Sequence, residues 1–191
     1  MSEQATTAAD RFPPAMRALH WLRALVVLGT LGAGLLMVNL PDDMTVKFEL
    51  LYPNHKQFGV LALLLALTQL LLRWRASGQG RLPRTPASLQ PWEQRLSHLA
   101  HRLLYVLLVA VPLMGYAMSS SFTQSDGVPF FFIGNLPELL PKNDSAFEVF
   151  QLLHKILAYA LLALLALHVA GAIKHRLAHR GGEGDVLRRM L

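Results

Sequence analysis

The chain has 191 residues and a mass of 21.2 kDa, a length that allows one domain or two very small ones. Hydrophobic residues make up 53% of the chain and charged residues only 16%, whereas soluble domains carry roughly 25% charged residues. This composition argues against an ordinary soluble enzyme and against a charge-rich disordered chain. Cysteine is absent, which excludes disulfides and every metal or cluster held by thiolates.

Four long apolar runs dominate the sequence, and each offers roughly 20 mostly apolar residues, enough to cross a hydrocarbon layer of about 30 Å. They predict an all-α integral membrane four-helix bundle with helices at about 18–40, 55–75, 93–119 and 147–175. A soluble bundle is the weaker interpretation, because too little polar surface is left to cover four such helices. We expect residues 1–15 to be a disordered tail, 16–178 a single transmembrane domain, and 179–191 a cytoplasmic tail.

The basic residues predict the orientation of this bundle. With the N-terminus inside, 14 of the 18 lysines and arginines lie on the inner side, and only Lys47, Lys56, Lys142 and Lys155 lie outside. Short loops rich in Lys and Arg stay in the cytoplasm, so both termini are expected to be cytoplasmic in a multi-pass protein of a bacterial inner membrane. The formal charge of +6 is thus explained by membrane topology, and no nucleic-acid partner is expected.

The longest connection on the outer side, residues 119–146, contains the apolar run 128–133 with three adjacent phenylalanines. Exposing such a run to water is unfavourable. We therefore expect this loop to pack over a site at the outer end of the bundle, or to lie in the membrane interface as an anchor without a role in access.

Six of the eight histidines lie within or at the ends of the apolar spans. Ionisable residues inside a bilayer are costly and usually mark a functional site, and neutral imidazole is a common ligand of haem iron. His154 and His168 lie 14 residues apart on the fourth expected helix. Fourteen residues complete four turns to within about 40°, so both side chains share one face, about 21 Å apart along the axis. Two stacked sites follow, one towards each surface.

Each of these histidines needs a partner to complete a site with two imidazole ligands. His55 opens the second helix at its outer end, level with His154, and His20 opens the first helix at its inner end, towards the depth of His168. His98 and His101 open the third helix on the inner side, and His101 is the stronger rival to His20. A copper or zinc centre is disfavoured, because its ligands would have to meet at one depth.

Nearby cations suit the anionic propionates of a haem. Lys56 and Lys155 each follow a proposed outer ligand, and Arg17 and Arg23 flank His20. Their alternative role is to anchor the helix ends at the membrane surface.

The ordered motifs resemble the bacterial cytochrome b561 family, which is related to the cytochrome b subunits of nickel–iron hydrogenases and formate dehydrogenases. The resemblance covers about residues 15–178. It rests on LHWLRA around His20, HKQFG from His55, RWR, LP-x-x-P and PWE in the linker, LAHRLLY followed by P-L-x-G on the third helix, and LLHKILAYALLALLALH with His154 and His168.

The resemblance implies a membrane protein that holds two b-type haems, one between His20 and His168 and the other between His55 and His154. It also implies electron exchange between a periplasmic donor and membrane ubiquinone. Some family members oxidise superoxide, which would make the chain a superoxide:ubiquinone oxidoreductase, and others relay electrons from a partner dehydrogenase or periplasmic protein as a membrane anchor subunit. A proton-coupled transporter that uses the histidines is disfavoured, because such proteins show broken helices and polar residues at mid-membrane depth.

Overall fold

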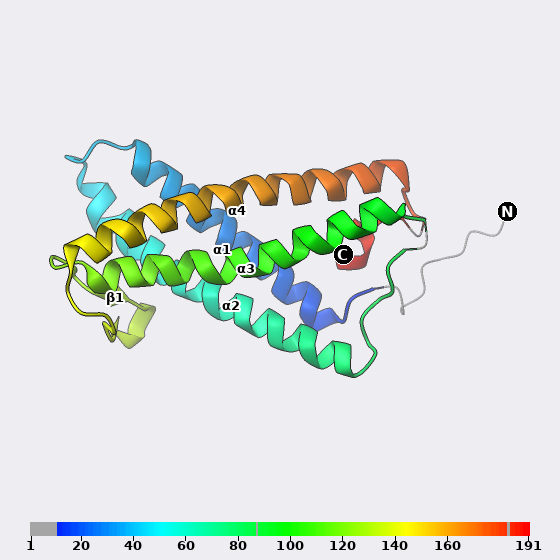
Figure 1. Cartoon of the computed structure of the whole chain (residues 1–191), viewed down its shortest axis with the longest axis horizontal. Coiled ribbons are helices and arrows are strands. Elements are labelled where there is room, and N and C mark those ends of the chain that lie inside the picture. Colours follow the sequence, from blue (N-terminus) through cyan, green and yellow to red (C-terminus); the bar gives the residue numbers. More distant parts are fainter. Residues whose placement is uncertain (1–10, 87, 183) are drawn as a thin grey trace.

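Four long helices make up most of the computed structural model, which describes residues 11–86, 88–182 and 184–191. They are α1 (Pro14–Asn39), α2 (Tyr52–Gly78), α3 (Pro91–Ser121) and α4 (Asp144–Ala178). All four are long and apolar enough to cross a membrane. The structure therefore confirms the prediction of a mostly helical protein with four potential membrane spans (Figure 1).

Local signals in the sequence explain where these helices begin. Pro14 and Pro91 occupy first-turn positions, where the missing N–H group costs nothing. Gln90 and Glu93 form a reciprocal capping box at the start of α3, and the Asn143 side chain accepts a hydrogen bond from the Ala146 N–H at the start of α4. Pro14 and Ala15 thus belong to α1 rather than to the expected N-terminal tail. Residues 1–10 of that tail lie outside the described residues.

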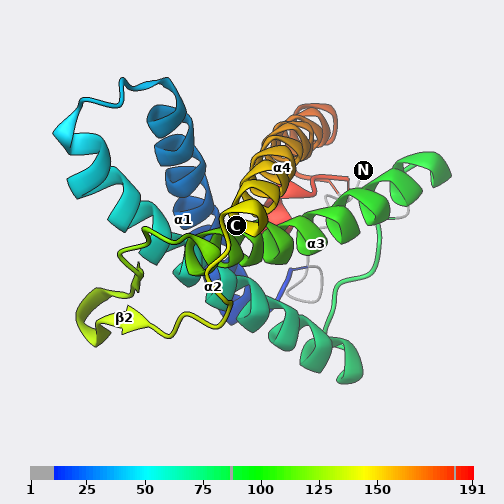
Figure 2. The same ribbon diagram turned by 60° about the vertical axis from the view of Figure 1, so that its left-hand side comes forward.

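The helices run alternately up and down. Figure 1 shows the described start of α1, the α2–α3 linker and the C-terminus at one end of the bundle, and the α1–α2 and α3–α4 connections at the other. Here the first is called the linker end and the second the loop end. The view in Figure 2 shows α1 and α2 splaying apart from α3 and α4 towards the loop end. Contacts join α1 to α2, α2 to α3 and α3 to α4.

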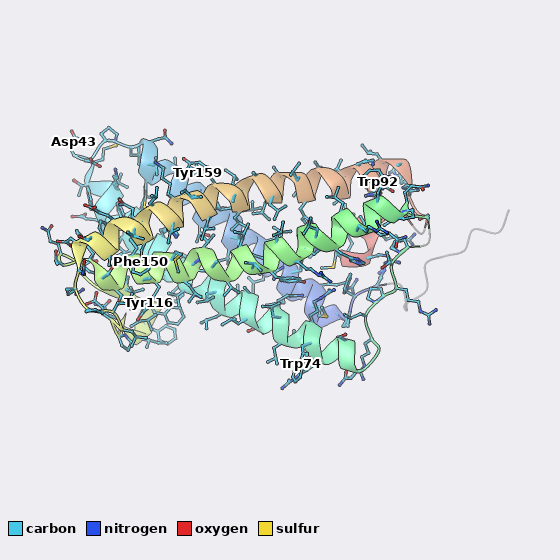
Figure 3. The ribbon with its side chains drawn as sticks, in the orientation of Figure 1. Asp43, Trp74, Trp92, Tyr116, Phe150 and Tyr159 are labelled. Atoms are coloured by element: carbon cyan, nitrogen blue, oxygen red, sulfur yellow. The ribbon has the colours of Figure 1, made fainter. Side chains whose placement is uncertain are left out.

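A small apolar core holds the middle of the bundle. Its buried members come from all four helices and are Val27, Ala62, Ala66, Leu104, Leu108, Val111 and Leu161. Outside this core the helices expose many leucines, and only 6% of the most apolar window of α4 is buried. A surface of this kind suits contact with lipid rather than water. The exposed Trp74 and Trp92 lie near the linker end, where aromatic side chains commonly mark a membrane interface (Figure 3).

Short elements close the two ends of the bundle. At the loop end are a π-helix, η2 (Lys47–Leu51), and a hairpin in which β1 (Val128–Pro129) pairs antiparallel with β2 (Asn135–Leu136) around η3 (Phe131–Ile133). At the linker end η4 (Leu187–Met190) folds back onto α1, where the Trp21 indole N–H donates to the Met190 carbonyl at 2.7 Å. The C-terminal segment is therefore packed against the bundle.

Candidate functional site

Two histidines face each other near the loop end of the bundle. His55 lies in the first turns of α2 and His154 lies on α4, and their ring centroids are 6.1 Å apart with the ring planes at 87°. These are the two residues that the sequence pairs at the outer level. The fold brings them together because α2 begins, and α4 passes, at the same end of the bundle (Figure 1).

The imidazole of His154 is oriented by the backbone of α3. Its Nδ1 lies 2.9 Å from the carbonyl oxygen of Val111, so the Nδ1–H donates and Nε2 is left as the free, basic nitrogen. Gly115, one turn after Val111, permits this approach: a Cβ atom there would lie 3.0 Å from His154 Cε1. A neutral imidazole with one nitrogen fixed in this way is suited to bind a metal through the other.

His55 lies close to α1. A Cβ atom on Gly34 would lie 3.3 Å from His55 Cε1. The Nδ1 of His55 is buried without a hydrogen-bond partner among the described residues. Both imidazoles therefore lie against a glycine of a neighbouring helix, and the His154 ring is in addition oriented by a backbone carbonyl.

A second group of histidines gathers towards the linker end. The ring centroids of His101 and His168 are 5.2 Å apart with the planes at 88°, and His20 lies within electrostatic range of both. His101 Nδ1 lies 2.6 Å from the Ser97 carbonyl oxygen, which leaves its Nε2 free as well. The structure thus brings together His168 and both of the partners that the sequence offers for it. Of the three remaining histidines, His98 is exposed and lies within electrostatic range of His101, and His175 and His179 stack on each other at the end of α4.

The predicted cationic residues have different environments. Lys56 Nζ donates to Asp126 Oδ1 at 2.6 Å and to the Gly127 carbonyl at 2.9 Å, so it fastens the outer loop to α2 directly beside His55. Lys155 is exposed and has no partner within the described part of the chain. Arg23 is only 7% exposed, and its Nη1 is buried without a partner among the described residues.

The outer loop is held against the start of α2 by two further contacts. The Phe131 N–H donates to the Gln57 side-chain oxygen at 3.1 Å, and the Phe131 ring packs edge-on against Phe58 at 5.4 Å. The Lys56 ammonium holds the pKa of Asp126 below its usual value of 3.8, because it donates a hydrogen bond to the ionised carboxylate. The loop therefore packs against the start of α2, at the residues that directly follow His55, while Phe132 at the hairpin tip is 98% exposed.

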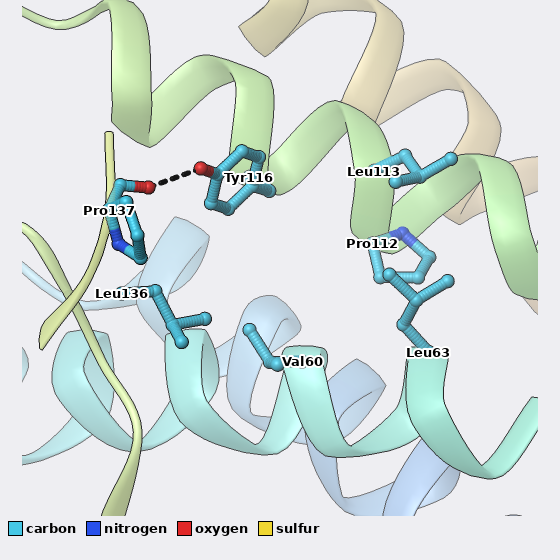
Figure 4. Close-up of a pocket in the computed structure, with 7 residues that line it drawn as sticks. All are labelled: Val60, Leu63, Pro112, Leu113, Tyr116, Leu136 and Pro137. Atoms are coloured by element: carbon cyan, nitrogen blue, oxygen red, sulfur yellow. Dashed lines mark hydrogen bonds between the residues drawn. The ribbon is translucent and has the colours of Figure 1, made fainter. Parts of the chain in front are cut away.

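A pocket of about 280 Å³ opens between α2, α3 and this loop (Figure 4). Its lining is apolar except for the Tyr116 hydroxyl, which donates to the Pro137 carbonyl. The lining residues are Val60, Leu63, Pro112, Leu113, Tyr116, Leu136 and Pro137. Pro112 and Tyr116 flank the part of α3 that carries Gly115, so the pocket lies close to the helix segment against which His154 docks.

The sequence pattern did not predict several features of this site. The sequence did not indicate that the Val111 carbonyl orients His154, that Arg73 and Tyr105 lie near the inner histidines, or that Gln69 is buried. The P-L-x-G motif was a usable signal for one of them, since its last residue is Gly115. The other features depend on how neighbouring helices are rotated, and the sequence pattern does not encode that rotation.

The fold and the site together define a class of protein: a membrane-spanning helical bundle whose interior histidines can bind a metalloporphyrin. The model of the family described as "Prokaryotic cytochrome b561" matches residues 11–191. The chain is 30% identical to "Cytochrome b561 homolog 2" of Escherichia coli (strain K12) over 97% of this chain and 94% of that protein. It is 26% identical to "Cytochrome b561 homolog 1" of the same organism, over 87% and 90% of the two chains. The chain belongs to the prokaryotic cytochrome b561 family.

Membership of this family makes the chain a multi-pass membrane cytochrome that transfers electrons and binds haem b. The residues present fit such a group. His154 offers a free Nε2, His55 has an unsatisfied buried nitrogen, and Gly34 and Gly115 leave the space in which both imidazoles lie. The buried guanidinium of Arg23, whose Nη1 has no partner among the described residues, is matched to an anion such as a haem propionate.

Proposed function

We propose that the chain is a di-haem electron carrier that connects a periplasmic donor with ubiquinone in a bacterial inner membrane. The observation that supports this most directly is the arrangement of the histidines in two groups. One group contains His154 and the other His168, 14 residues and about 21 Å apart on the same helix. When bound, each haem iron supplies a one-electron redox centre.

The chain's own residues bind and orient these groups. His55 of α2 and His154 of α4 would hold the outer iron, and the Val111 carbonyl keeps the Nε2 of His154 unprotonated and available. His20 and His168 bind the inner iron. His101 is the alternative partner of His168, since its ring lies 5.2 Å from that of His168 and its Nδ1 is held by Ser97.

Cations neutralise the propionates at both levels in this proposal. Arg23 is buried beside the inner histidines, and Lys155 is exposed next to His154. Lys56 binds Asp126 in the described conformation, so it would serve a propionate by exchanging or sharing that partner. The apolar helix surfaces contact lipid, which holds both haem sites at fixed depths.

Both termini are proposed to lie in the cytoplasm, because 14 of the 18 lysines and arginines belong to that side. The loop end then faces the periplasm and meets the electron donor. Superoxide is one candidate donor: two superoxide ions lose one electron each and become O₂, while ubiquinone takes up the two electrons and two protons to become ubiquinol. A small periplasmic redox protein or a partner dehydrogenase is the other candidate, in which case the chain acts as a membrane anchor subunit.

A reduced-minus-oxidised visible spectrum of the purified protein, combined with haem quantification, tests the proposal. We expect two b-type haems per chain. One haem, or none after expression with ample haem supply, would contradict it. The donor is then tested by mixing the oxidised protein and a water-soluble ubiquinone with a superoxide source. Superoxide-dependent quinone reduction supports the oxidoreductase, and its absence together with co-purification of a dehydrogenase supports the anchor subunit.

A further inference from the structure

Arg23 is an unusual residue in this structure. It lies on a membrane-spanning helix, is only 7% exposed, and its Nη1 is buried without a hydrogen-bond partner in the described chain. The ion pairs found among the described residues use other cations, so no carboxylate balances this charge. A buried guanidinium without a counter-ion is strongly unfavourable in apolar surroundings. The described part of the chain supplies no anion for this guanidinium, so a bound anion would stabilise it.

A second arginine shares the aromatic neighbour of Arg23. The guanidinium carbon of Arg23, from α1, is 5.8 Å from the ring centroid of Tyr105 on α3, and that of Arg73, from α2, is 5.9 Å from the same centroid. The face of an aromatic ring attracts cations, so Tyr105 holds one arginine from each of two helices. Arg73 also has no ion-pair partner in the part of the chain that the structure describes. Two like charges that converge on one ring repel each other unless an anion joins them.

The two arginines lie at the level of the inner histidines. Arg23 follows His20 by three residues on α1, so the two share a helix face, and it lies within electrostatic range of His20 and His168. Arg73 lies within electrostatic range of His101. Gln69, one turn before Arg73, is 2% exposed, and its Oε1 is buried without a partner among the described residues. Unsatisfied polar atoms of both kinds, a donor and an acceptor, are thus present at this depth.

We infer that Arg23, Arg73 and Tyr105 form a carboxylate-binding site that holds a propionate of the inner haem, with the Gln69 amide beside it. The inference rests on the proposed function for the presence of that haem. A guanidinium matches a carboxylate with two parallel hydrogen bonds, and the second arginine adds charge without needing the same geometry. The Oε1 of Gln69 accepts a hydrogen bond from a water molecule that accompanies the carboxylate.

A lipid phosphate is the other source of an anion on the cytoplasmic side. The burial of Arg23 favours the propionate, because a headgroup would have to enter the bundle to reach a side chain that is 93% covered. The two sources also differ in their consequences. A propionate ties the arginines to the electronic properties of the inner haem, whereas a lipid phosphate makes them respond to membrane composition.

The test is a redox titration of the full-length protein in lipid nanodiscs, with the variants Arg23→Gln and Arg73→Gln. Loss of a positive charge near the iron stabilises the ferric state, so we expect the midpoint potential of the inner haem to become more negative while that of the outer haem stays unchanged. The inner haem is identified as the one lost in His168→Ala. Arg75→Gln is the matched control, because Arg75 is an exposed arginine two residues further along α2.

Further variants separate charge from structure. Arg23→Lys and Arg73→Lys keep the charge and should return the inner potential most of the way to that of the wild type, whereas a merely structural role would not be rescued by lysine. If Arg23→Gln loses the inner haem altogether, then Arg73→Gln, which alters a less buried side chain, and the two lysine variants provide the measurement.

Two results would overturn the inference. One is an unchanged inner potential in both glutamine variants of a protein that still holds two haems; this defeats the inference while leaving the proposed function intact. The other is an inner potential that moves when phosphatidylglycerol replaces phosphatidylcholine in the nanodiscs, with the response abolished by Arg23→Gln, which assigns the site to lipid. A wild-type protein without two haems would instead refute the proposed function.

Discussion

The Nδ1 atom of His154 lies 2.9 Å from the carbonyl oxygen of Val111, so the side chain of α4 is oriented by the backbone of α3. Gly115, four residues after Val111, has no side chain to cover that oxygen. His55 lies against Gly34 of α1, where a Cβ atom would lie 3.3 Å from its Cε1, but its Nδ1 has no hydrogen-bond partner among the described residues. Each outer imidazole thus lies against a glycine of a neighbouring helix, and His154 is also oriented by a backbone carbonyl.

Replacement of Gly115 should therefore remove the outer haem. A Cβ atom at this position would lie 3.0 Å from Cε1 and 3.1 Å from Nδ1 of His154, so Gly115→Val must displace the imidazole, and Gly115→Ala should weaken binding. We expect the haem content of Gly115→Val to fall from two per chain towards one. Gly29→Val is the matched control, since a Cβ atom there meets no atom of another residue within 4 Å. Full haem content in Gly115→Val would show that the His154 position does not matter for binding.

The sequence predicted the four helices and the two levels of histidines, because both follow from local patterns. Run length identifies a membrane-length helix, and the 14-residue spacing places His154 and His168 on one face. It favoured His20 over His101 as the partner of His168 without excluding His101, since both lie at the depth of His168 and the choice depends on the rotation of α1 and α3. Likewise, the sequence offered Lys56 to a propionate, whereas the structure pairs it with Asp126, 70 residues away. Contacts of this range depend on the loop conformation.

Alanine variants of the histidines will identify the inner ligand. His154→Ala and His168→Ala should each remove a different haem, because the two residues lie at different levels of α4. His55→Ala should resemble the first and His20→Ala the second, as measured by the spectrum and midpoint potential of the haem that remains. His101→Ala should keep both haems. If His101→Ala loses one haem while His20→Ala keeps two low-spin haems, His101 is the ligand instead.

Single-cysteine labelling can establish the orientation, since the native chain has no cysteine. In intact cells Gln124→Cys, on the exposed loop end, should react with a membrane-impermeant maleimide. Gly78→Cys, at the exposed end of α2 where a Cβ atom meets nothing within 4 Å, should react only after the cells are permeabilised. The opposite pattern would reverse the orientation that the lysine and arginine distribution predicts.

The outer loop contains a matched pair of phenylalanines that tests its role in access. Phe131 packs on Phe58 at 5.4 Å, one turn after His55, whereas Phe132 is 98% exposed. Phe131→Ser should loosen the loop and raise the rate at which a small soluble donor reduces the outer haem, while Phe132→Ser should leave that rate unchanged. Serine at all three of residues 130–132 should behave like Phe131→Ser. Equal rates in all variants with intact spectra would leave the loop as a membrane anchor only.

The ion pair between Lys56 and Asp126 should fasten this loop in a pH-dependent way. Since the pKa of Asp126 is lowered from 3.8, the ionised carboxylate stabilises the docked loop above that value, and the contribution is lost as the pH falls through the lowered pKa. The rate of outer-haem reduction by a small neutral donor should therefore not change through this pair between about pH 5 and pH 8. The rate in the wild type should rise only in more acidic solution, where it should approach the rate of a variant that lacks the ion pair.

Asp126→Asn provides that variant. It removes the charge at every pH, so the small donor should reduce the outer haem of this variant faster than that of the wild type at neutral pH. The rate in the variant should not change further over the pH range in which Asp126 titrates in the wild type. The gain should be modest and should shrink in high salt, because a largely exposed ion pair contributes at most about 1 kcal/mol. Asp43→Asn, which alters an exposed acid on the α1–α2 connection, is the control and should match the wild type. Identical rates in Asp126→Asn and Asp43→Asn would mean that Gln57 and Phe58 hold the loop without help from the ion pair.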